Sequence, residues 1–441
     1  MRAFAPSCLV LLALLAAGSA PATAAPPVSG VYSEEKQSRA LAKTGFDLVR
    51  RPFTWKLIEP RPGKFNWASY DGIVGAAAQR GLTLFPFLLD PPPWAVTKPT
   101  ERGMRPPRRP KDFARFATAV VKRYGPRGSY WPANPYIPFK PIRAWQIWNE
   151  PNLPAFWQPR PDARAYVKLL RPAAQAIHKA DRQATVVAAG LPESRQGVPQ
   201  LDYLKAMYRA KAEGAADALA IHAYAPDAAG VIALVSQFRS AMTARRDKTP
   251  LWVTEFGWAD GGEDSLFTVS AKEQAQLLSQ AVTGLRALSR PLGLGGLFLF
   301  RWRDPSERVL DIDIWPYHAG LVTTKGKKKP ALKAVRKALA KPVPRGAAKP
   351  GRLTLDVVQT GRRAVRARCS RKCTFGLSVI ESVPREARGD LERVLIRSRA
   401  VGRTATFRTP VLAGRELLVS AYTADGAADR FSLSSPRTDR R

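Results

Sequence analysis

Short apolar segments alternate with longer amphipathic ones along most of the chain, from residue 30 to residue 340. Apolar runs rich in β-branched and aromatic residues predict strands, and apolar residues three and four positions apart predict helices. Eight strand–helix pairs in succession predict a parallel sheet that is covered by helices and closed into a (β/α)8 TIM barrel. The predicted strands lie within residues 30–32, 45–55, 81–89, 142–148, 184–189, 216–224, 251–256 and 295–302. The predicted helices lie within residues 34–42, 65–78, 113–124, 163–180, 201–212, 231–245, 271–288 and 329–339.

The pattern changes after residue 341, which ends the barrel domain predicted for residues 25–341. Residues 342–351 are rich in proline, alanine, glycine and basic residues and predict a linker. From residue 352 to residue 441 short alternating runs are separated by turn residues, without a clear amphipathic helix. This part of the chain predicts a small antiparallel β-sandwich. The predicted strands of the sandwich lie within residues 353–358, 364–367, 373–379, 394–398, 404–407 and 416–422.

The first residues have the composition of a secretory signal peptide. Met1-Arg2 is followed by an apolar run over residues 9–17 and then by Ala22-Thr23-Ala24. This order predicts cleavage after Ala24, so that residues 1–24 form the signal peptide and the mature protein is secreted. The apolar run is too short for a stable transmembrane helix, and no other stretch is long and apolar enough. The sequence therefore predicts an extracellular protein, with or without attachment to a cell wall.

Two cysteines remain after the predicted signal peptide, because Cys8 belongs to it. Cys369 and Cys373 are expected to form a disulfide, since exported proteins fold in oxidising surroundings. A free pair or a metal site is less favoured, because no histidine lies near them in the sequence.

The formal net charge of +36 predicts attraction to polyanions. Nucleic acid is disfavoured, because an exported protein meets little of it and no basic–aromatic binding module is recognisable. Anionic cell-wall polymers and acidic polysaccharides are better candidates. Alternatively, the excess of basic residues serves solubility or reflects genome composition, since it is spread along the whole chain. The C-terminal part contributes the basic residues Arg362, Arg363, Arg366, Arg368, Arg371 and Lys372.

A carboxylate stands at the end of each of two predicted strands. Asn149-Glu150-Pro151 follows strand four, and Glu255 closes strand seven. In a barrel of this kind the catalytic groups lie at the carboxyl-terminal ends of the strands. Two carboxylates about 5–5.5 Å apart are what retaining glycoside hydrolysis requires. For Asn149-Glu150-Pro151 alone, a solvated turn would be the simpler interpretation.

The segment Trp148-Asn149-Glu150-Pro151-Asn152-Leu153, continuing to Phe156-Trp157, resembles the acid/base segment of glycoside hydrolase family 39. More broadly, residues 30–340 resemble the clan of retaining (β/α)8 glycosidases that includes family 5. The resemblance implies that Glu150 is the general acid/base and Glu255 the nucleophile. It does not extend to the C-terminal part.

The resemblance also implies roles for two residues close to these carboxylates. Arg50 resembles the strand-two arginine that holds the nucleophile and keeps it ionised. The neighbouring Arg51 could fill this role instead of Arg50. The simpler interpretation is that the arginine forms only a surface ion pair. Asn149 would bond the sugar 2-hydroxyl, a contact that strengthens in the transition state.

His222 and Tyr224 lie two residues apart on one face of strand six. The clan has a histidine and a tyrosine in this region, and the tyrosine commonly contacts the nucleophile. A core histidine with satisfied hydrogen bonds is the alternative for His222.

Tryptophans support a sugar site in the barrel domain. All 11 lie between Trp55 and Trp315, and flat aromatic faces suit the C–H faces of pyranose rings. Trp94 follows strand three, and Trp302 resembles the strand-eight tryptophan that forms the floor of the sugar site. Core packing is expected for at least half of the tryptophans.

The sequence therefore predicts a secreted retaining glycosidase that cleaves a poly- or oligosaccharide by double displacement and needs no metal or cofactor. A non-catalytic wall-binding protein on a glycosidase barrel and a transglycosylase are the alternatives. Basic residues near the predicted barrel mouth are compatible with a substrate that carries carboxylates. They are Arg102, Arg105, Arg108, Arg109 and Lys111 after strand three, and Arg301 and Arg303 at the end of strand eight.

Overall fold

The computed structural model describes residues 26–34, 39–100, 103–194, 196–307, 312–343, 353–361, 363–383, 391–412 and 415–434. The predicted signal peptide lies outside these residues, and so does the predicted linker apart from its first two positions. None of the helices in the described ranges is long and apolar enough to cross a membrane.

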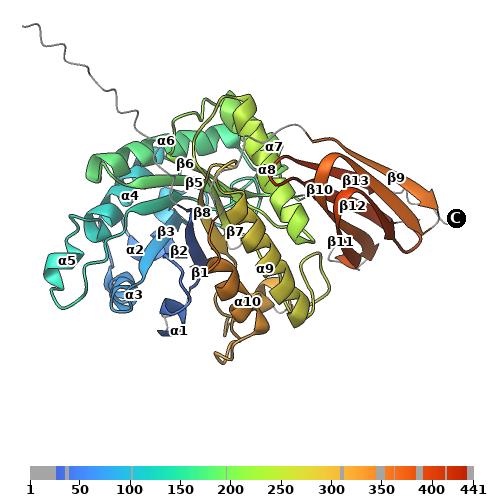
Figure 1. Ribbon diagram of the computed structural model, residues 1–441. Coiled ribbons are helices and arrows are strands. Elements are labelled where there is room, and N and C mark those ends of the chain that lie inside the picture. The colour runs from blue at the N-terminus through green and yellow to red at the C-terminus, as the bar shows by residue number, and fades with distance from the viewer. Residues whose placement is uncertain are drawn as a thin grey trace, which may run out of the picture.

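Eight parallel strands close into a barrel in chain order, as the alternation predicts, and helices surround them (Figure 1). The strands are β1 (Val28–Tyr32), β2 (Leu48–Thr54), β3 (Thr83–Leu89), β4 (Ala144–Ile147), β5 (Thr185–Pro192), β6 (Ala218–His222), β7 (Leu251–Glu255) and β8 (Leu294–Leu299). The helices are α1 (Arg39–Ala42), α2 (Trp55–Ile58), α3 (Ala68–Ala78), α4 (Pro110–Tyr124), α5 (Tyr130–Ala133), α6 (Ala163–Ala180), α7 (Gln200–Arg209), α8 (Ala228–Ala244), α9 (Ala271–Ala287) and α10 (Pro330–Leu339). Two short 3-10 helices, η1 (Pro93–Ala95) and η2 (Trp315–His318), lie in the loops that follow β3 and β8.

Local capping explains where several of the outer helices begin. The carboxylates of Asp162 and Asp227 accept backbone N–H groups at the starts of α6 and α8. Ser270 and Glu273 form a reciprocal capping box at the start of α9. Such caps satisfy backbone donors that a helix leaves free at its first turn. α6 continues through Pro172 as one helix.

The barrel interior changes from apolar to polar along the strands. A separate buried cluster fills its lower part with Phe85, Ala144, Val187, Ala218, Ala220, Trp252 and Phe298. Two positions further along three of these strands, on the same face, stand Gln146, His222 and Thr254. All three are fully buried. The strands thus carry polar groups toward their carboxyl-terminal ends, where a barrel of this kind has its reactive face.

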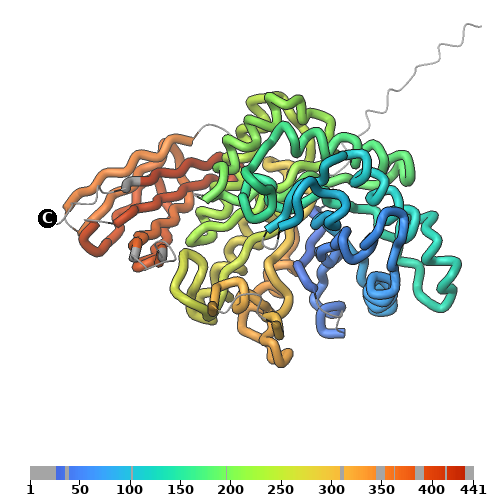
Figure 2. The backbone as a smooth tube through the Cα atoms, turned by 180° about the vertical axis from the view of Figure 1, so that it is seen from behind, coloured from blue at the N-terminus to red at the C-terminus, as the bar shows by residue number. Residues whose placement is uncertain are grey.

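The C-terminal part forms a small antiparallel sheet, as predicted, packed at the side of the barrel (Figures 1 and 2). Its strands are β9 (Leu355–Gly361), β10 (Ala364–Val383), β11 (Leu391–Arg408), β12 (Arg415–Tyr422) and β13 (Ala428–Ser434). The sheet curls, because β10 pairs along its length with β11 on one edge and with β9 and then β12 on the other. The layers of the predicted sandwich are thus parts of one curled sheet.

Two pairs of strands that the sequence pattern separates are continuous in the structure. Residues 364–367 and 373–379 belong to β10, and residues 394–398 and 404–407 belong to β11. The pattern is interrupted by a bulge, where the partner on β11 moves from Thr404 to Gly402 between Arg368 and Cys373 of β10. The predicted disulfide between Cys369 and Cys373 is confirmed and closes this bulge. In the sequence, the residues of this bulge therefore resemble a turn between two separate strands.

The sheet contacts the barrel at the start of α8. Asp227 accepts a hydrogen bond from the Ser378 hydroxyl at 2.7 Å, and Arg397 Nε donates to the Pro226 carbonyl at 2.7 Å. A Cβ atom at Gly376 would lie 2.5 Å from an Asp227 carboxylate oxygen, so glycine permits this close approach. These contacts fix the sheet to the barrel by specific polar bonds.

Candidate active site

The two carboxylates predicted from the sequence meet at the carboxyl-terminal end of the barrel. Glu255 is the last residue of β7, and Glu150 follows β4, which ends at Ile147. One carboxylate oxygen of each residue lies within 4.8 Å of the other. This separation suits an acid/base and a nucleophile acting on one anomeric carbon, since retaining enzymes hold the pair about 5–5.5 Å apart.

Arg50 lies beneath the pair and holds Glu255 in place. Its guanidinium is fully buried, and Nη1 donates to Glu255 Oε1 at 2.5 Å. Nε donates to Gln146 at 2.8 Å, and Nη2 donates to Asn149 Oδ1 at 2.7 Å. Because every edge of the guanidinium is bonded, Arg50 has one orientation and presents a fixed positive charge to Glu255. Neighbouring Arg51 instead donates to the Glu34 carbonyl.

Two amide side chains complete this network, one of them absent from the sequence predictions. Gln146 on β4 accepts from Arg50 and donates to the Ala188 carbonyl at 3.0 Å, so it locks the arginine from within the barrel. A single amide on the inward face of an otherwise apolar strand is the signal that could have identified it. Asn149 accepts from Arg50 through Oδ1. Its amide nitrogen has no hydrogen-bond partner among the described residues, so it can donate to a ligand.

His222 ends β6 and faces both carboxylates. Its Nδ1 lies 2.7 Å from Glu150 Oε1 and 3.7 Å from Glu255 Oε2. The imidazole is fully buried and occupies space that only glycine leaves open, because a Cβ atom at Gly190 on β5 would lie 2.1 Å from its ring. Gly190 is therefore a further residue of the site that the sequence predictions missed.

Tyr224 binds Glu255 and stands in a group of aromatic rings. Its hydroxyl donates to Glu255 Oε2 at 2.7 Å. Its ring centroid lies 5.2 Å from Trp315, 5.6 Å from Phe267 and 6.3 Å from Phe300. We call Tyr224, Phe267, Phe300 and Trp315 the aromatic wall. It joins the loops that follow β6, β7 and β8 beside the nucleophile candidate.

The two tryptophans predicted to bind sugar pack against other parts of the protein. Trp302 is 2% exposed and packs in the main hydrophobic core, so its faces are covered by protein rather than open to a sugar. Trp94 packs edge-on against Trp55 at 5.4 Å and donates to the Glu59 carbonyl at 3.2 Å. The aromatic wall lies near the carboxylates, because Tyr224 bonds Glu255, and Trp315 is the half-buried tryptophan in this wall.

Unusual backbone conformations occur close to the two carboxylates. Trp148 and Glu150 have positive φ values of 72° and 44°, and Asp90 at the end of β3 has a φ of 59°. Residues other than glycine adopt this region rarely, at a cost of roughly 1–2 kcal/mol each. Trp148 and Glu150 flank Asn149, so the chain turns sharply here, and the turn places Glu150 beside His222 and Glu255.

The surroundings push the pKa values of the two carboxyl groups in opposite directions. Burial is the main cause that raises the pKa of Glu150, and the nearby charge of Glu255 adds to it, while His222 opposes both. Burial would also raise the pKa of Glu255, but His222, Arg50 and Tyr224 together lower it below its ordinary value. A pair of this kind supplies one protonated acid and one ionised nucleophile at the same pH.

The activity of such a pair should depend on pH with a bell-shaped profile. Glu255 must be ionised, so kcat/KM should rise as pH passes through its lowered pKa; Glu150 must be protonated, so kcat/KM should fall as pH passes through its raised pKa. Initial rates measured across the acidic and neutral range check this. Tyr224→Phe removes a bond that lowers the pKa of Glu255, so it should move the acid limb upward and leave the basic limb in place. A profile with one ionisation in the wild type would contradict the assignment.

Glu150, His222 and Glu255 also bring ligand atoms close enough together to hold a metal ion. A cation at this point would lie beside the Arg50 guanidinium, whose Nη1 is 2.5 Å from Glu255. The second oxygen of Glu255 already accepts the Tyr224 hydroxyl. The positive charges of such a cation and of Arg50 would repel each other strongly in a buried site. These three side chains are therefore better suited to proton transfer than to metal binding.

Residues 139–290 match the family described as glycosyl hydrolase catalytic core. This segment includes Glu150, His222 and Glu255. No curated protein sequence matches the chain. The match covers the part of the barrel from β4 to α9 and indicates a glycosyl hydrolase catalytic core there.

Several solved structures share the fold. A family 39 glycoside hydrolase from Bacteroides cellulosilyticus WH2 is 18% identical with a TM-score of 0.52, over 86% of this chain and 81% of the other. A family 39 enzyme from Xanthomonas axonopodis pv. citri is 16% identical with a TM-score of 0.54, over 90% of this chain and 95% of the other. A family 5 enzyme from Streptomyces cattleya, solved with the disaccharide Manβ1-4GlcNAc, is 18% identical with a TM-score of 0.53, over 72% of this chain and 83% of the other. At these identities the likeness concerns the fold.

Proposed function

We propose that this glycosyl hydrolase core cleaves O-glycosidic bonds of an oligo- or polysaccharide with retention of anomeric configuration. The observation that carries the proposal is the pairing of Glu150 and Glu255. Their oxygens lie within 4.8 Å, and their surroundings shift the two pKa values apart. In inverting enzymes the two carboxyl groups lie farther apart, because a water molecule must fit between one of them and the sugar. Here the distance leaves room for the sugar carbon but not for this additional water.

In the first step Glu255 attacks the anomeric carbon, and the bond from that carbon to the leaving oxygen breaks. Glu150 donates its proton to the leaving oxygen, so the departing group leaves as a neutral alcohol. Arg50 and Tyr224 hold Glu255 in position during the attack. The amide nitrogen of Asn149 would donate to the sugar 2-hydroxyl.

In the second step water hydrolyses the glycosyl ester on Glu255. Glu150, now ionised, accepts a proton from the water as its oxygen attacks the anomeric carbon, and Glu255 leaves as a carboxylate. Each step inverts the carbon, so the two steps together retain its configuration. His222 lies within 4 Å of both carboxylates and would steady the negative charge as it moves from one to the other.

Retention can be tested directly by following the first-formed sugar with proton NMR. With an aryl β-glycoside that the enzyme hydrolyses, the β-anomer of the free sugar should appear before mutarotation mixes the two anomers. Initial release of the α-anomer would rule out double displacement. Transfer to added alcohols or sugars, measured in the same samples, distinguishes a transglycosylase from a hydrolase.

A non-catalytic binding protein is the alternative of a different class. Binding alone does not need a buried acid with a raised pKa beside a second, ionised carboxylate. Burying two carboxylates together is costly unless charge and hydrogen bonds compensate, and here Arg50, His222 and Tyr224 supply them. The arrangement is therefore better explained by catalysis.

An acidic sugar is a candidate substrate because of Arg301. Its guanidinium lies 5.5 Å from the Phe300 ring of the aromatic wall, and its Nε has no partner among the described residues. One edge of the Arg301 guanidinium already forms an ion pair, since Nη2 lies 3.3 Å from the Glu34 carboxylate. Of the basic residues after β3, Arg109 pairs with Asp112. Hydrolysis of aryl glycosides with a neutral sugar but not of the matching glycuronides would rule out this preference.

Attachment to an anionic polymer outside the cell is the second part of the proposal. Arg366 and Arg368 stand on the exposed face of β10, two residues apart and thus roughly 7 Å along the strand. With Arg403 and Asp356 they line a surface groove of about 460 Å³, which thus carries three positive charges and one negative charge. Within the described ranges, no ion pair involves Arg366 or Arg368. Secretion, as the N-terminal residues indicate, would bring this groove to cell-wall polymers.

Charge removal at the groove should weaken adhesion without changing hydrolysis. The double substitution Arg366→Gln and Arg368→Gln should lower the affinity for an insoluble uronate-containing polysaccharide by roughly threefold to tenfold, since each exposed charge contributes little. Co-sedimentation at low salt measures this, with aryl glycoside hydrolysis as the activity check. The control is Lys333→Gln with Lys337→Gln, which removes the same charge from α10. Equal losses in both double variants would show that only net charge matters.

A further inference from the structure

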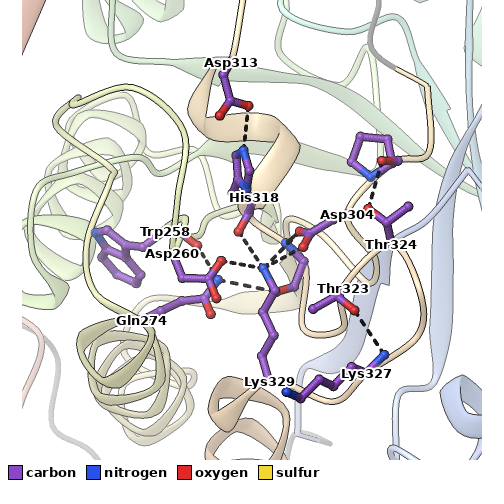
Figure 3. Close-up of polar contacts among 12 residues, drawn as sticks. Trp258, Asp260, Gln274, Asp304, Asp313, His318, Thr323, Thr324, Lys327 and Lys329 are labelled. Carbon is purple, nitrogen blue, oxygen red and sulfur yellow. Dashed lines mark hydrogen bonds and ion pairs between the residues drawn. The ribbon is translucent and has the colours of Figure 1, made fainter.

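A buried lysine joins the loops that follow β7 and β8. Lys329 directly precedes the first residue of α10, and its side chain is 5% exposed. Its ammonium lies 2.5 Å from Asp260 Oδ1, 2.8 Å from Asp304 Oδ2 and 2.9 Å from the His318 carbonyl (Figure 3). An ammonium has three N–H donors, so these acceptors use all of them. Lys329 is therefore saturated and has no donor left for a ligand.

The three acceptors belong to different segments of the barrel mouth. Asp260 lies in the loop after β7, Asp304 lies in the loop after β8, and His318 ends the short helix η2. Asp260 N–H also donates to the His318 carbonyl, and Asp304 Oδ1 accepts from the Gly320 N–H. Gln274 of α9 supports the same region from below by donating to the Trp258 carbonyl (Figure 3). One positive charge thus fastens two loops to each other.

These two loops carry two members of the aromatic wall. Trp315 begins η2, which His318 ends. Phe267 is fixed to the loop of Asp260, because its carbonyl accepts from the Ala259 N–H at 2.9 Å. The Phe267 and Trp315 rings lie 5.0 Å apart, and both pack against Tyr224, which donates to Glu255.

We infer that Lys329 is a positioning residue, which holds Trp315 and Phe267 against Tyr224 and so fixes the hydrogen bond from Tyr224 to Glu255. This inference rests on the proposed function for its effect on catalysis. Lys329 acts through its ion pairs with Asp260 and Asp304 and has no ion pair with Glu150 or Glu255. Without the ammonium, two nearly buried carboxylates would face each other without a counter-charge, and the two loops would separate.

The test compares Lys329→Met with Lys327→Met. Lys327 is exposed and lies two residues away, and both of its hydrogen bonds to Thr323 involve its backbone, so its substitution serves as the matched control. The substrate is the dinitrophenyl glycoside that the wild type hydrolyses, and the active sites are counted with a fluorinated glycosyl reagent. In Lys329→Met, kcat per active site should fall by roughly tenfold to a hundredfold, as small misplacements of reacting groups produce. The acid limb of the pH profile should also move upward, while Lys327→Met should match the wild type.

A structural role alone predicts something else. It would lower the folded fraction and the melting temperature but leave kcat per active site and the acid limb unchanged, and that result would overturn the inference. If Lys329→Met folds poorly, Asp260→Asn tests the same link while keeping the shape of the side chain. Combining either variant with Trp315→Ala should add little further loss, because the two changes act through one path.

Amide hydrogen exchange provides a readout that does not depend on activity. Residues 312–322 should exchange faster in Lys329→Met than in the wild type, and Lys327→Met should exchange as the wild type does. Unchanged exchange in Lys329→Met would refute the positioning role. If the wild type hydrolyses no glycoside, the proposed function fails, and hydrogen exchange still decides whether Lys329 holds these loops.

Discussion

Replacing Glu255 by glutamine should lower kcat/KM on the order of 10⁵-fold, because an amide cannot form the glycosyl ester. Shape and size are nearly unchanged, and the amide oxygen can still accept the bond from Tyr224. The loss should therefore appear in the chemical step rather than in substrate binding. Steady-state rates on an aryl glycoside, with binding measured separately by calorimetry, distinguish these two effects.

The substitution also leaves Arg50 without its anionic partner in a buried position. Removing one member of a buried ion pair typically costs about 3–5 kcal/mol, so circular dichroism must show that the variant is folded. Glu213→Gln serves as the control, because Glu213 is exposed and lies outside the site. A folded Glu255→Gln enzyme that keeps more than a small fraction of activity would contradict the assignment of the nucleophile.

Glu150→Gln should have a large effect that depends on the leaving group. General acid catalysis contributes about 10²–10⁴-fold, so alkyl and sugar leaving groups should lose activity within this range. Activated aryl leaving groups need little protonation, so their first step should be nearly unaffected and the glycosyl ester should accumulate. The basic limb of the pH profile should disappear, since it reports the ionisation of Glu150.

Azide added to Glu150→Ala provides the outcome that separates the two glutamates. In this variant water has no general base to activate it, so azide should attack the glycosyl ester in its place. The product should be a glycosyl azide of retained configuration. In Glu255→Ala, azide would take the place of the nucleophile and give the inverted product. Equal losses for all leaving groups in Glu150→Gln would argue that Glu150 shapes the site without transferring a proton.

The positions of the two glutamates could be predicted because each ends an apolar strand. Alternation of strands and helices predicts the barrel, and in a barrel all strand ends meet at one rim. Glu150 and Glu255 are therefore expected to be neighbours although 105 positions separate them, as their numbers show. The same reasoning places His222 and Tyr224 near them, and the contacts of both residues agree.

The sequence pattern could not identify residues whose role depends on side-chain packing. Gln146 and Gly190 lie inside apolar strands, where a polar or small residue does not reveal what it faces. Trp302 follows β8 in the sequence, but its ring turns into the core, and Phe300 and Trp315 take part in the aromatic wall instead. Strand periodicity specifies a face but not which side chain reaches across the barrel mouth.

The C-terminal sheet shows a similar limit. The residues around Cys369 and Cys373 look like a turn between two strands, yet the disulfide closes a bulge within β10. The link from Lys329 to Asp260 and Asp304 also joins segments that are distant in the sequence. Such contacts are set by how loops cross one another, and local patterns carry little information about that.

Glu255 should form a covalent bond to the sugar during each catalytic cycle. The most direct measurement is intact-mass spectrometry after incubation with 2-deoxy-2-fluoro glycosyl fluorides of several sugars, followed by peptide mapping of any adduct. The fluorine slows hydrolysis of the ester, so a competent nucleophile stays labelled. We expect one added glycosyl group, located on Glu255 and absent from Glu255→Gln. An adduct on Glu150 or on another residue would contradict this account, and so would an unlabelled enzyme that hydrolyses the unfluorinated glycoside of the same sugar.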